Sequence, residues 1–161
     1  MLGLRLLVVL GSGGHTAQML KLVEKLGKRF QYIYMIVKDD RLSEKKISIP
    51  GQVCYVHRAR RHEDGLLVTI FKVLRLFVES IGILYRSNPD AIVSAGPGMA
   101  VPISLLGKLT GTKVIYIEDW SRVYQKSRTG KILYRFSDLF FVQWTELKEQ
   151  YPKGIYAGRL S

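Results

Sequence analysis

Short apolar runs alternate along this chain with longer segments that have the apolar spacing of helices. The apolar runs cover residues 4–10, 31–37, 53–57, 91–94, 113–117 and 139–142, and the helical segments cover residues 16–28, 66–86 and 99–109. Because the runs are apolar almost without a break, each strand is expected to be buried on both faces. The sequence therefore predicts an α/β, Rossmann-like fold in which helices cover both faces of a parallel sheet. At 161 residues, a single domain over residues 1–161 is expected.

The charge of the chain indicates an anionic partner. There are 25 Lys and Arg residues against 13 Asp and Glu residues, which gives a net charge of +12. Nucleic acid, anionic lipid headgroups and a diphosphate ligand all suit such a surface, and charge does not choose among them. No nucleic-acid-recognition motif is present, so no nucleic-acid partner is expected. The histidines are scattered and Cys54 is the single cysteine, so we predict neither a metal site nor a cofactor.

A glycine-rich turn follows the first apolar run and opens directly into a helix. Its residues are Gly11, Ser12, Gly13, Gly14, His15 and Thr16. Small residues let a ligand approach the backbone, and the unpaired amides at a helix start attract phosphate. The spacing fits neither a dinucleotide fingerprint nor a P-loop, which leaves a phosphate of another kind or a tight turn without a ligand. His15 either donates to a phosphate, acts as a general base, or bonds only to the helix backbone.

A second turn of small residues lies between the fourth strand and its helix. It reads SAGPG at residues 94–98. In a doubly wound sheet, two such turns can border one crevice. Ser94, Gly96 and Gly98 are therefore predicted to contact the same phosphate as the first turn, unless the second turn serves only the backbone geometry.

Charged side chains follow the fifth strand at the same predicted edge. Glu118 or Asp119 can take a proton from a hydroxyl or bind a sugar, and Arg122 can balance the charge of a diphosphate. A structural salt bridge among them is the alternative. Residues 127–130 are expected to form a flexible loop with a helix start. The basic residues around this loop either form a solvated face or, if the site takes a diphosphate, clamp that ligand.

The segment 66–86 is predicted to be a helix with an unusually apolar surface, because its polar residues fall on one narrow stripe. A basic run lies directly upstream, and apolar bulk beside basic residues is typical of an element at an anionic membrane surface. Burial against another protein is the alternative. The predicted membrane-facing residues are Arg60, Arg61, Leu67, Ile70, Phe71, Leu74 and Phe77. Residues 2–10 are too short to span a bilayer, which takes about 20 residues, so the chain is expected to stay on the cytoplasmic side.

Four motifs taken in order resemble a known family. They are GSGGHT at residues 11–16, SAGPG at 94–98, YIEDWSR at 116–122 and VQW at 142–144. In this order they are similar to the oligosaccharide-biosynthesis family that supplies the membrane-recruiting, acceptor-binding subunit for N-acetylglucosamine transfer to dolichol-linked acceptors. Bacterial relatives in capsule and exopolysaccharide synthesis look similar, and so does the N-terminal domain of the peptidoglycan lipid-intermediate N-acetylglucosaminyltransferase.

The resemblance implies the N-terminal half of a GT-B glycosyltransferase. Such a subunit would bind a lipid-diphosphate sugar acceptor at the cytoplasmic face of a membrane, as a peripheral or monotopic protein. A separate donor-binding glycosyltransferase subunit would hold most of the UDP-sugar, expected to be UDP-N-acetylglucosamine, and this chain would be inactive alone. By motif, the glycine turns would contact the acceptor phosphate, and His15 and Glu118 would be candidates for the catalytic base. A non-catalytic membrane scaffold, or a galactosyl- or glucosyltransferase enhancer of bacterial type, remain as alternatives.

Overall fold

Seven strands pair in one sheet in the computed structural model, which describes residues 3–58 and 65–160. The strand order is β3-β2-β1-β4-β5-β6-β7, and every neighbouring pair is parallel. The strands are β1 Arg5–Val9, β2 Gln31–Val37, β3 Gln52–Val56, β4 Ala91–Ser94, β5 Lys113–Ile117, β6 Leu139–Val142 and β7 Ile155–Tyr156. The predicted α/β fold with a parallel sheet is confirmed.

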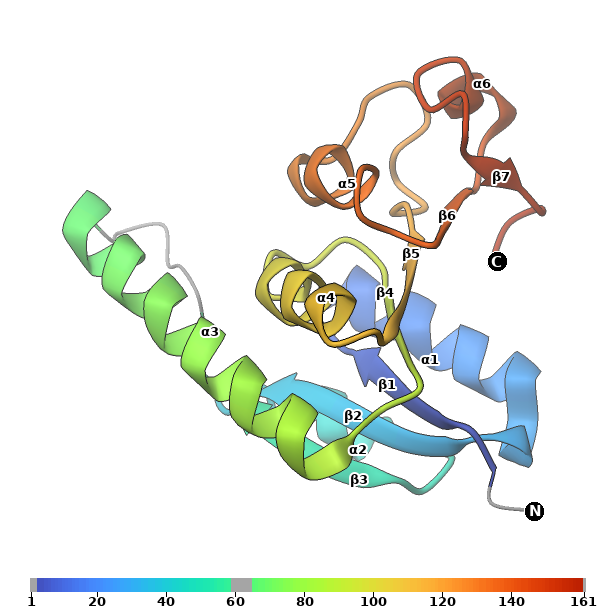
Figure 1. The fold of residues 1–161 in the computed structure, drawn as a ribbon. Helices are drawn as coiled ribbons and strands as arrows, with labels where there is room; N and C mark the ends of the chain where they lie inside the picture. The colour runs from blue at the N-terminus through green and yellow to red at the C-terminus, as the bar shows by residue number, and fades with distance from the viewer. Residues whose placement is uncertain (1–2, 59–64, 161) are drawn as a thin grey trace.

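Helices cover both faces of this sheet (Figure 1). They are α1 Gly14–Leu26, α2 Arg41–Lys45, α3 Leu66–Ser87, α4 Ala100–Leu109, α5 Arg128–Leu133 and α6 Thr145–Lys148, with a 3-10 turn, η1, at Gly27–Arg29. On one face, α1 contributes Met19 and Val23 to the core. On the other face, α3, α4 and α5 contribute Leu76, Ile103 and Leu133.

Strand β1 shows why the apolar runs have no polar alternation. Leu7 and Val9 belong to the core on the side of α3 and α4, whereas Leu6 and Val8 belong to the core on the side of α1. All four side chains are buried. Successive strand residues point to opposite faces, so a strand covered on both sides needs an unbroken apolar run.

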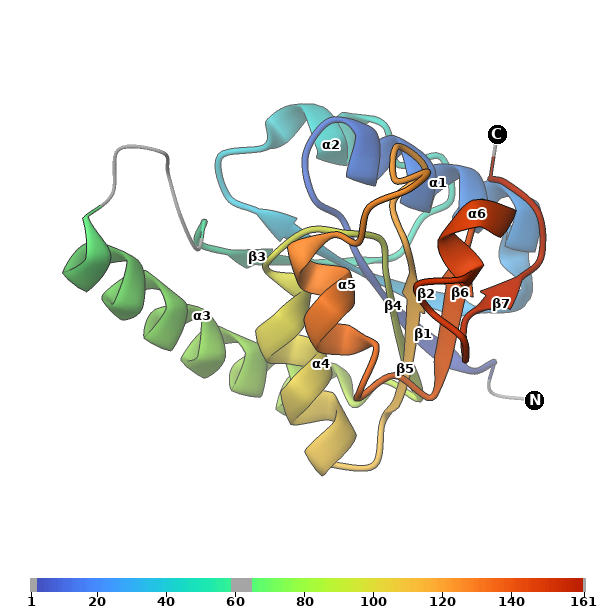
Figure 2. The same ribbon diagram turned by 90° about the horizontal axis from the view of Figure 1, so that it is seen from above.

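Helix α3 projects beyond the edge of the sheet, as both ribbon views show (Figures 1 and 2). It packs against α4 and β3. Its buried residues, Leu76, Ser80, Ile83, Leu84 and Ser87, all lie between its middle and its C-terminal end. The first ten residues of α3, 66–75, contain no buried residue.

The segment after β5 differs from the expectation of a flexible loop at residues 127–130. Ser127 caps α5, because its hydroxyl accepts a hydrogen bond of 2.8 Å from the Gly130 amide. Thr129 and Gly130 are buried. A Cβ at Gly130 would lie only 2.7 Å from the Tyr151 hydroxyl, so this turn is packed against the C-terminal part of the chain. The predicted helix start is confirmed, whereas the expected flexible loop is wrong because tertiary packing orders residues 127–130.

Candidate functional site

The strand order brings the two glycine-rich turns together. β1 and β4 are parallel neighbours, so their carboxyl ends lie side by side. From β1 the chain continues to β2 and β3, which extend the sheet on one side of β1. It then returns through α3 to β4, which pairs with the other side of β1. This reversal is the position at which open α/β sheets hold ligands.

A pocket of about 290 Å³ lies between the two turns. It is lined by Gly11, Ser12, His15, Val37, Arg58, Gly96, Pro97, Gly98 and Met99. The structure thus places residues of both predicted turns, together with His15, around one cavity.

Two helices begin at this pocket. The amides at the start of α1 are open, whereas the first two amides of α4, those of Ala100 and Val101, donate to the Pro97 and Gly98 carbonyls at 3.0 and 3.2 Å. The residues that precede α1 and α4 are Gly13 and Met99, and neither forms a side-chain cap. Neither helix has an acidic residue in its first turn. The first amides of a helix have no partner within the helix, and the helix dipole adds positive potential there. The arrangement suits an anion such as a phosphate.

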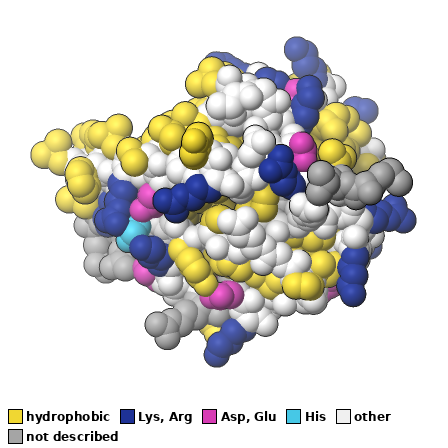
Figure 3. All heavy atoms as spheres, turned by 60° about the horizontal axis from the view of Figure 1, so that its bottom comes forward, with side chains coloured by type: hydrophobic (Ala, Val, Ile, Leu, Met, Phe, Trp, Pro, Cys, Tyr) yellow, Lys and Arg dark blue, Asp and Glu magenta, His cyan; other side chains and the backbone are white. Residues whose placement is uncertain are grey.

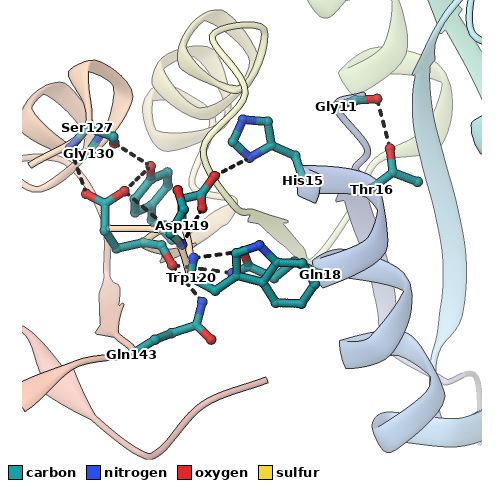
Figure 4. A network of polar contacts seen from close by, with 12 residues as sticks. Gly11, His15, Thr16, Gln18, Asp119, Trp120, Ser127, Gly130 and Gln143 are labelled. Atoms are coloured by element: carbon teal, nitrogen blue, oxygen red, sulfur yellow. Dashed lines mark hydrogen bonds and ion pairs between the residues drawn. The ribbon is translucent and has the colours of Figure 1, made fainter. Parts of the chain in front are cut away.

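His15 lies beside a buried carboxylate (Figure 4). Its Nδ1 atom is 2.9 Å from Asp119 Oδ2, an ion-pair distance, although Nδ1 is not aligned for a regular hydrogen bond. The other oxygen, Asp119 Oδ1, accepts a hydrogen bond of 2.7 Å from the Ser121 amide. Burial alone would raise the pKa of Asp119, but the His15 ring and Ser121 hold it well below the ordinary value of an aspartate. Asp119 is therefore a carboxylate at neutral pH.

Two glycines make room for the His15 ring. Gly96 has a φ of +88°, and a Cβ there would lie 2.6 Å from His15 Nδ1. A Cβ at Gly11 would lie 2.8 Å from His15 Cβ and 2.9 Å from Pro97 Cβ. The glycines of both turns are needed for the close approach of His15, as well as for any approach of a ligand.

Other residues of the predicted phosphate site lie behind or beside the pocket. The Thr16 hydroxyl is buried and donates to the Gly11 carbonyl at 2.9 Å, so it holds the turn. Ser94 is buried and does not line the pocket. Gly13 and Gly14 are exposed at the start of α1. Arg122 is exposed outside the pocket lining, and its backbone amide donates to the Asp119 carbonyl at 2.9 Å.

Glu118 does not reach the pocket. Its side chain has no exposed surface, and it points to the C-terminal part of the chain. One carboxylate oxygen accepts a hydrogen bond from the Tyr151 hydroxyl at 2.9 Å, and the other accepts from the Tyr116 hydroxyl at 3.3 Å. Burial raises the pKa of both tyrosines, followed by the effect of the Glu118 charge. In this position, Glu118 holds β5, α5 and the C-terminal segment together.

Gln18 fixes the backbone between these two acids. From α1 its amide nitrogen donates to the Glu118 carbonyl at 3.3 Å, and its amide oxygen accepts from the Trp120 amide at 3.2 Å. Both contacts are drawn in Figure 4. Asp119 lies between the two contacts, so α1 carries His15 and also positions the carboxylate that faces it.

Arg58 lines the pocket and was missed as a site residue. The basic run that begins at Arg58 was assigned to the membrane surface. Its position two residues after the end of β3, at the carboxyl edge of a parallel strand, was the available signal. Its guanidinium adds a permanent positive charge to the pocket lining.

Two polar residues of α3, Glu79 and Arg75, bond to each other and connect this helix to His57, the residue before Arg58. Glu79 accepts a hydrogen bond of 2.8 Å from the His57 amide, and its other oxygen lies 2.5 Å from His57 Nδ1. Arg75 Nε donates to Glu79 at 3.2 Å. Burial raises the pKa of Glu79, but the bonds from His57 and Arg75 outweigh it and lower the pKa. Glu79 and Arg75 thus link α3 to the residue that follows β3.

The rest of α3 presents large apolar side chains to solvent. Leu67, Phe71 and Leu74 are 81%, 68% and 59% exposed, and Ile70 is also exposed. Phe77 is half-buried, unlike the exposed Leu67, Ile70, Phe71 and Leu74. Arg60 and Arg61 lie outside the described residues. Further exposed residues of α3 are Leu66, Val68, Val78, Ile81 and Tyr85. Figure 3 shows hydrophobic side chains gathered where α3 projects. Among the described helices, none combines the length and apolarity needed to cross a membrane.

Comparison with known proteins identifies the family. The model of the family described as oligosaccharide biosynthesis protein Alg14 like matches residues 6–160. The chain belongs to this Alg14-like family. A member from Rattus norvegicus, named UDP-N-acetylglucosamine transferase subunit ALG14, is 39% identical over 98% of this chain and 83% of its own length. The Homo sapiens subunit is 37% identical with the same coverage, and the Schizosaccharomyces pombe subunit is 35% identical over 95% of this chain and 81% of its own length. The family resemblance of the four motifs is confirmed.

Solved structures share the fold of this Alg14-like chain at low sequence identity. MurG of Acinetobacter baumannii has a TM-score of 0.70 and 17% identity, over 97% of this chain and 44% of MurG. The UDP-N-acetylglucosamine 2-epimerase of Rickettsia bellii has a TM-score of 0.74 and 12% identity, over 98% of this chain and 45% of the epimerase. The chain therefore has the fold of the N-terminal half of a GT-B protein and spans less than half the length of these structures.

Proposed function

We propose that this chain is the acceptor-binding, membrane-associated subunit of a two-component glycosyltransferase. In this proposal it binds a polyprenyl- or dolichyl-diphosphate-linked sugar at the cytoplasmic face of a membrane and recruits a separate donor-binding subunit. That partner holds most of the donor, UDP-N-acetylglucosamine. The transfer is inverting, because the acceptor hydroxyl attacks the anomeric carbon of the donor directly.

The pocket between the glycine turns is the observation that carries this proposal. The open N-terminus of α1, the Arg58 guanidinium and the His15 ring converge on one cavity. The amides and Arg58 suit the diphosphate, because charge-assisted bonds to phosphate are strong. His15 is then the candidate general base at the acceptor hydroxyl. For Glu118 we propose a structural role, because its carboxylate is buried among other partners.

The exposed face of α3 supports association with a membrane surface. Transfer of exposed side chains such as Leu67 and Phe71 from water into the membrane lowers the free energy. The net charge of +12 favours binding to anionic headgroups. The link from Glu79 to His57 would place a pocket residue, Arg58, at a fixed position relative to this face. The lipid-linked acceptor would thus meet the pocket while its lipid tail stays in the membrane.

Reconstituted sugar transfer tests the proposal. Transfer from radiolabelled UDP-N-acetylglucosamine to a polyprenyl-diphosphate-linked sugar is measured in membranes with this chain, with the donor-binding subunit, and with both. Product only from both is expected, and product from this chain alone overturns the two-subunit proposal. Loss of transfer by His15→Ala, with assembly intact, excludes a non-catalytic scaffold. Transfer from UDP-galactose or UDP-glucose instead would favour the bacterial enhancer function.

A pair of arginine variants tests where the diphosphate binds. Arg58 lines the pocket, whereas Arg86 is exposed near the far end of α3. Arg58→Ala is expected to raise the KM for the acceptor by about tenfold or more, because hydrogen bonds to charged groups contribute about 1.5–3 kcal/mol. Arg86→Ala is expected to leave this KM unchanged. Equal effects of the two variants would mean that the arginines act only through net charge.

A further inference from the structure

Arg58 reaches the pocket from the end of an edge strand. Within the described sheet β3 pairs only with β2, so its other side has no neighbouring strand. Among residues 3–58 and 65–160, none forms a hydrogen bond or an ion pair with the Arg58 side chain. The direction of the Arg58 guanidinium therefore depends on the backbone that precedes it.

The peptide bond between Val56 and His57 is held from both sides. Its carbonyl, that of Val56, accepts a hydrogen bond of 2.9 Å from the amide of Lys38, which follows β2. Its amide, that of His57, points to α3 and donates to Glu79 Oε2 at 2.8 Å. An edge strand leaves such outward amides without a strand to accept from them. The Glu79 carboxylate supplies the missing acceptor.

The same carboxylate also holds the His57 ring. Glu79 Oε1 lies 2.5 Å from His57 Nδ1, and the Arg75 guanidinium lies 3.0 Å from His57 Nε2. A guanidinium has only donors, so Nε2 accepts and the proton of the neutral ring is on Nδ1. Arg75 Nε donates to Glu79 Oε1 at 3.2 Å and completes the cluster. The backbone and the side chain of His57 are thus fixed together against α3.

We infer that Glu79 is a positioning residue that holds Arg58 in the phosphate pocket through His57. Successive side chains of a chain that continues a strand point to opposite sides. With the His57 ring held against α3, the next side chain, that of Arg58, is directed away from this helix and lines the pocket. Rotation of the backbone at His57 would move the guanidinium away from a bound diphosphate. This inference rests on the proposed function and deepens it.

Steady-state kinetics of the assembled enzyme test the inference. Glu79→Gln is expected to raise the KM for the acceptor by about five- to tenfold with little change in kcat, because a misplaced guanidinium loses charge-assisted bonds to phosphate. In an Arg58→Ala background the same change is expected to have almost no further effect. Glu44→Gln is the matched control, because Glu44 also bonds to a residue of β3 and accepts from the Tyr55 hydroxyl at 2.7 Å. Equal effects of the two glutamine variants, or multiplying effects of the Glu79 and Arg58 changes, would overturn the inference.

Binding of inorganic pyrophosphate to the chain alone separates this inference from the proposed function. Calorimetry is expected to show that Arg58→Ala and Glu79→Gln each weaken binding by about five- to tenfold. Weaker binding by Arg58→Ala, with unchanged binding by Glu79→Gln, would overturn the positioning role alone. Unchanged binding by both variants would contradict the diphosphate site of the proposed function, and the inference with it.

Nitrogen NMR of the wild-type chain gives a readout that needs no variant. At a pH at which the ring is neutral, His57 is expected to have a protonated Nδ1 and an unprotonated Nε2, as its contacts with Glu79 and Arg75 require. A protonated Nε2 would overturn the inference, because Arg75 could not then donate to the ring and Nδ1 could not donate to Glu79.

Discussion

Replacement of Gly96 by alanine tests the geometry of the pocket most directly. Gly96 has a φ of +88°, and its added Cβ would lie 2.6 Å from His15 Nδ1. The left-handed backbone costs an L-residue about 1–2 kcal/mol. Insertion of a methyl group into a packed site costs about 1–3 kcal/mol more. Gly96→Ala is therefore expected to lower the free energy of unfolding by about 2–5 kcal/mol.

Gly111 provides a matched control for the backbone contribution. It follows α4 with a φ of +85°, and a Cβ there would meet nothing within 4 Å. Gly111→Ala is expected to cost only the backbone strain of about 1–2 kcal/mol. The difference between the two variants isolates the clash with His15, and it is expected to be about 1–3 kcal/mol.

Denaturant unfolding of both variants and the sugar-transfer assay provide the measurements. Gly96→Ala is expected to lose transfer activity because the His15 ring has to move, whereas Gly111→Ala is expected to keep it. Equal losses of stability, together with full activity of Gly96→Ala, would refute the packing of His15 against Gly96 and the function assigned to the pocket.

Three further predictions follow from buried and exposed side chains. Glu118→Gln is expected to lower the free energy of unfolding by about 1–3 kcal/mol, because an amide cannot accept hydrogen bonds from all the donors around this buried group. Unchanged thermal and denaturant unfolding would contradict the structural role of Glu118. Leu67→Glu combined with Phe71→Glu is expected to weaken binding to anionic vesicles by about tenfold or more, since each inserted side chain contributes about 1.5–3 kcal/mol. Leu42→Glu, at a 71% exposed site on α2, is the control in cosedimentation, and an equal loss there would point to charge alone. Burial, with a smaller effect of a nearby tyrosine, raises the pKa of Tyr34 to about 12. Its phenol ionises near pH 10 in the unfolded chain, so the free energy of unfolding is expected to fall from about pH 10 to 12. In urea titrations, the free energy of unfolding of Tyr34→Phe is expected to fall less steeply over this range. An identical slope would show that other groups cause the loss.

The layer structure and the glycine turns could be predicted from the sequence because both depend on local chemistry. An unbroken apolar run such as 4–10 is what a strand needs when both faces are covered. Small residues between a strand and a helix indicate a turn in which a ligand can approach the backbone amides at the helix start. These signals fixed the parallel α/β fold, placed His15 at the mouth of a turn and gave the family resemblance.

Which of two adjacent acids faces the pocket could not be predicted. Glu118 and Asp119 follow the same strand, and successive residues in an extended segment point to opposite sides. The first is buried beneath α5, and the second meets His15. Sequence shows that two carboxylates are present at the edge, but only the packing of the C-terminal part of the chain decides their directions.

Sequence by itself determined the repeating elements, the basic charge, the glycine-rich turns and the apolar helix at residues 66–86. Tertiary structure decided the strand order that joins the turns after β1 and β4, the entry of Arg58 into the pocket and the partial burial of Phe77. The reason is physical. Local propensities and periodicity act within a few residues, whereas a binding site depends on contacts between segments such as His15 and Asp119, which are brought together only when the sheet and its helices pack.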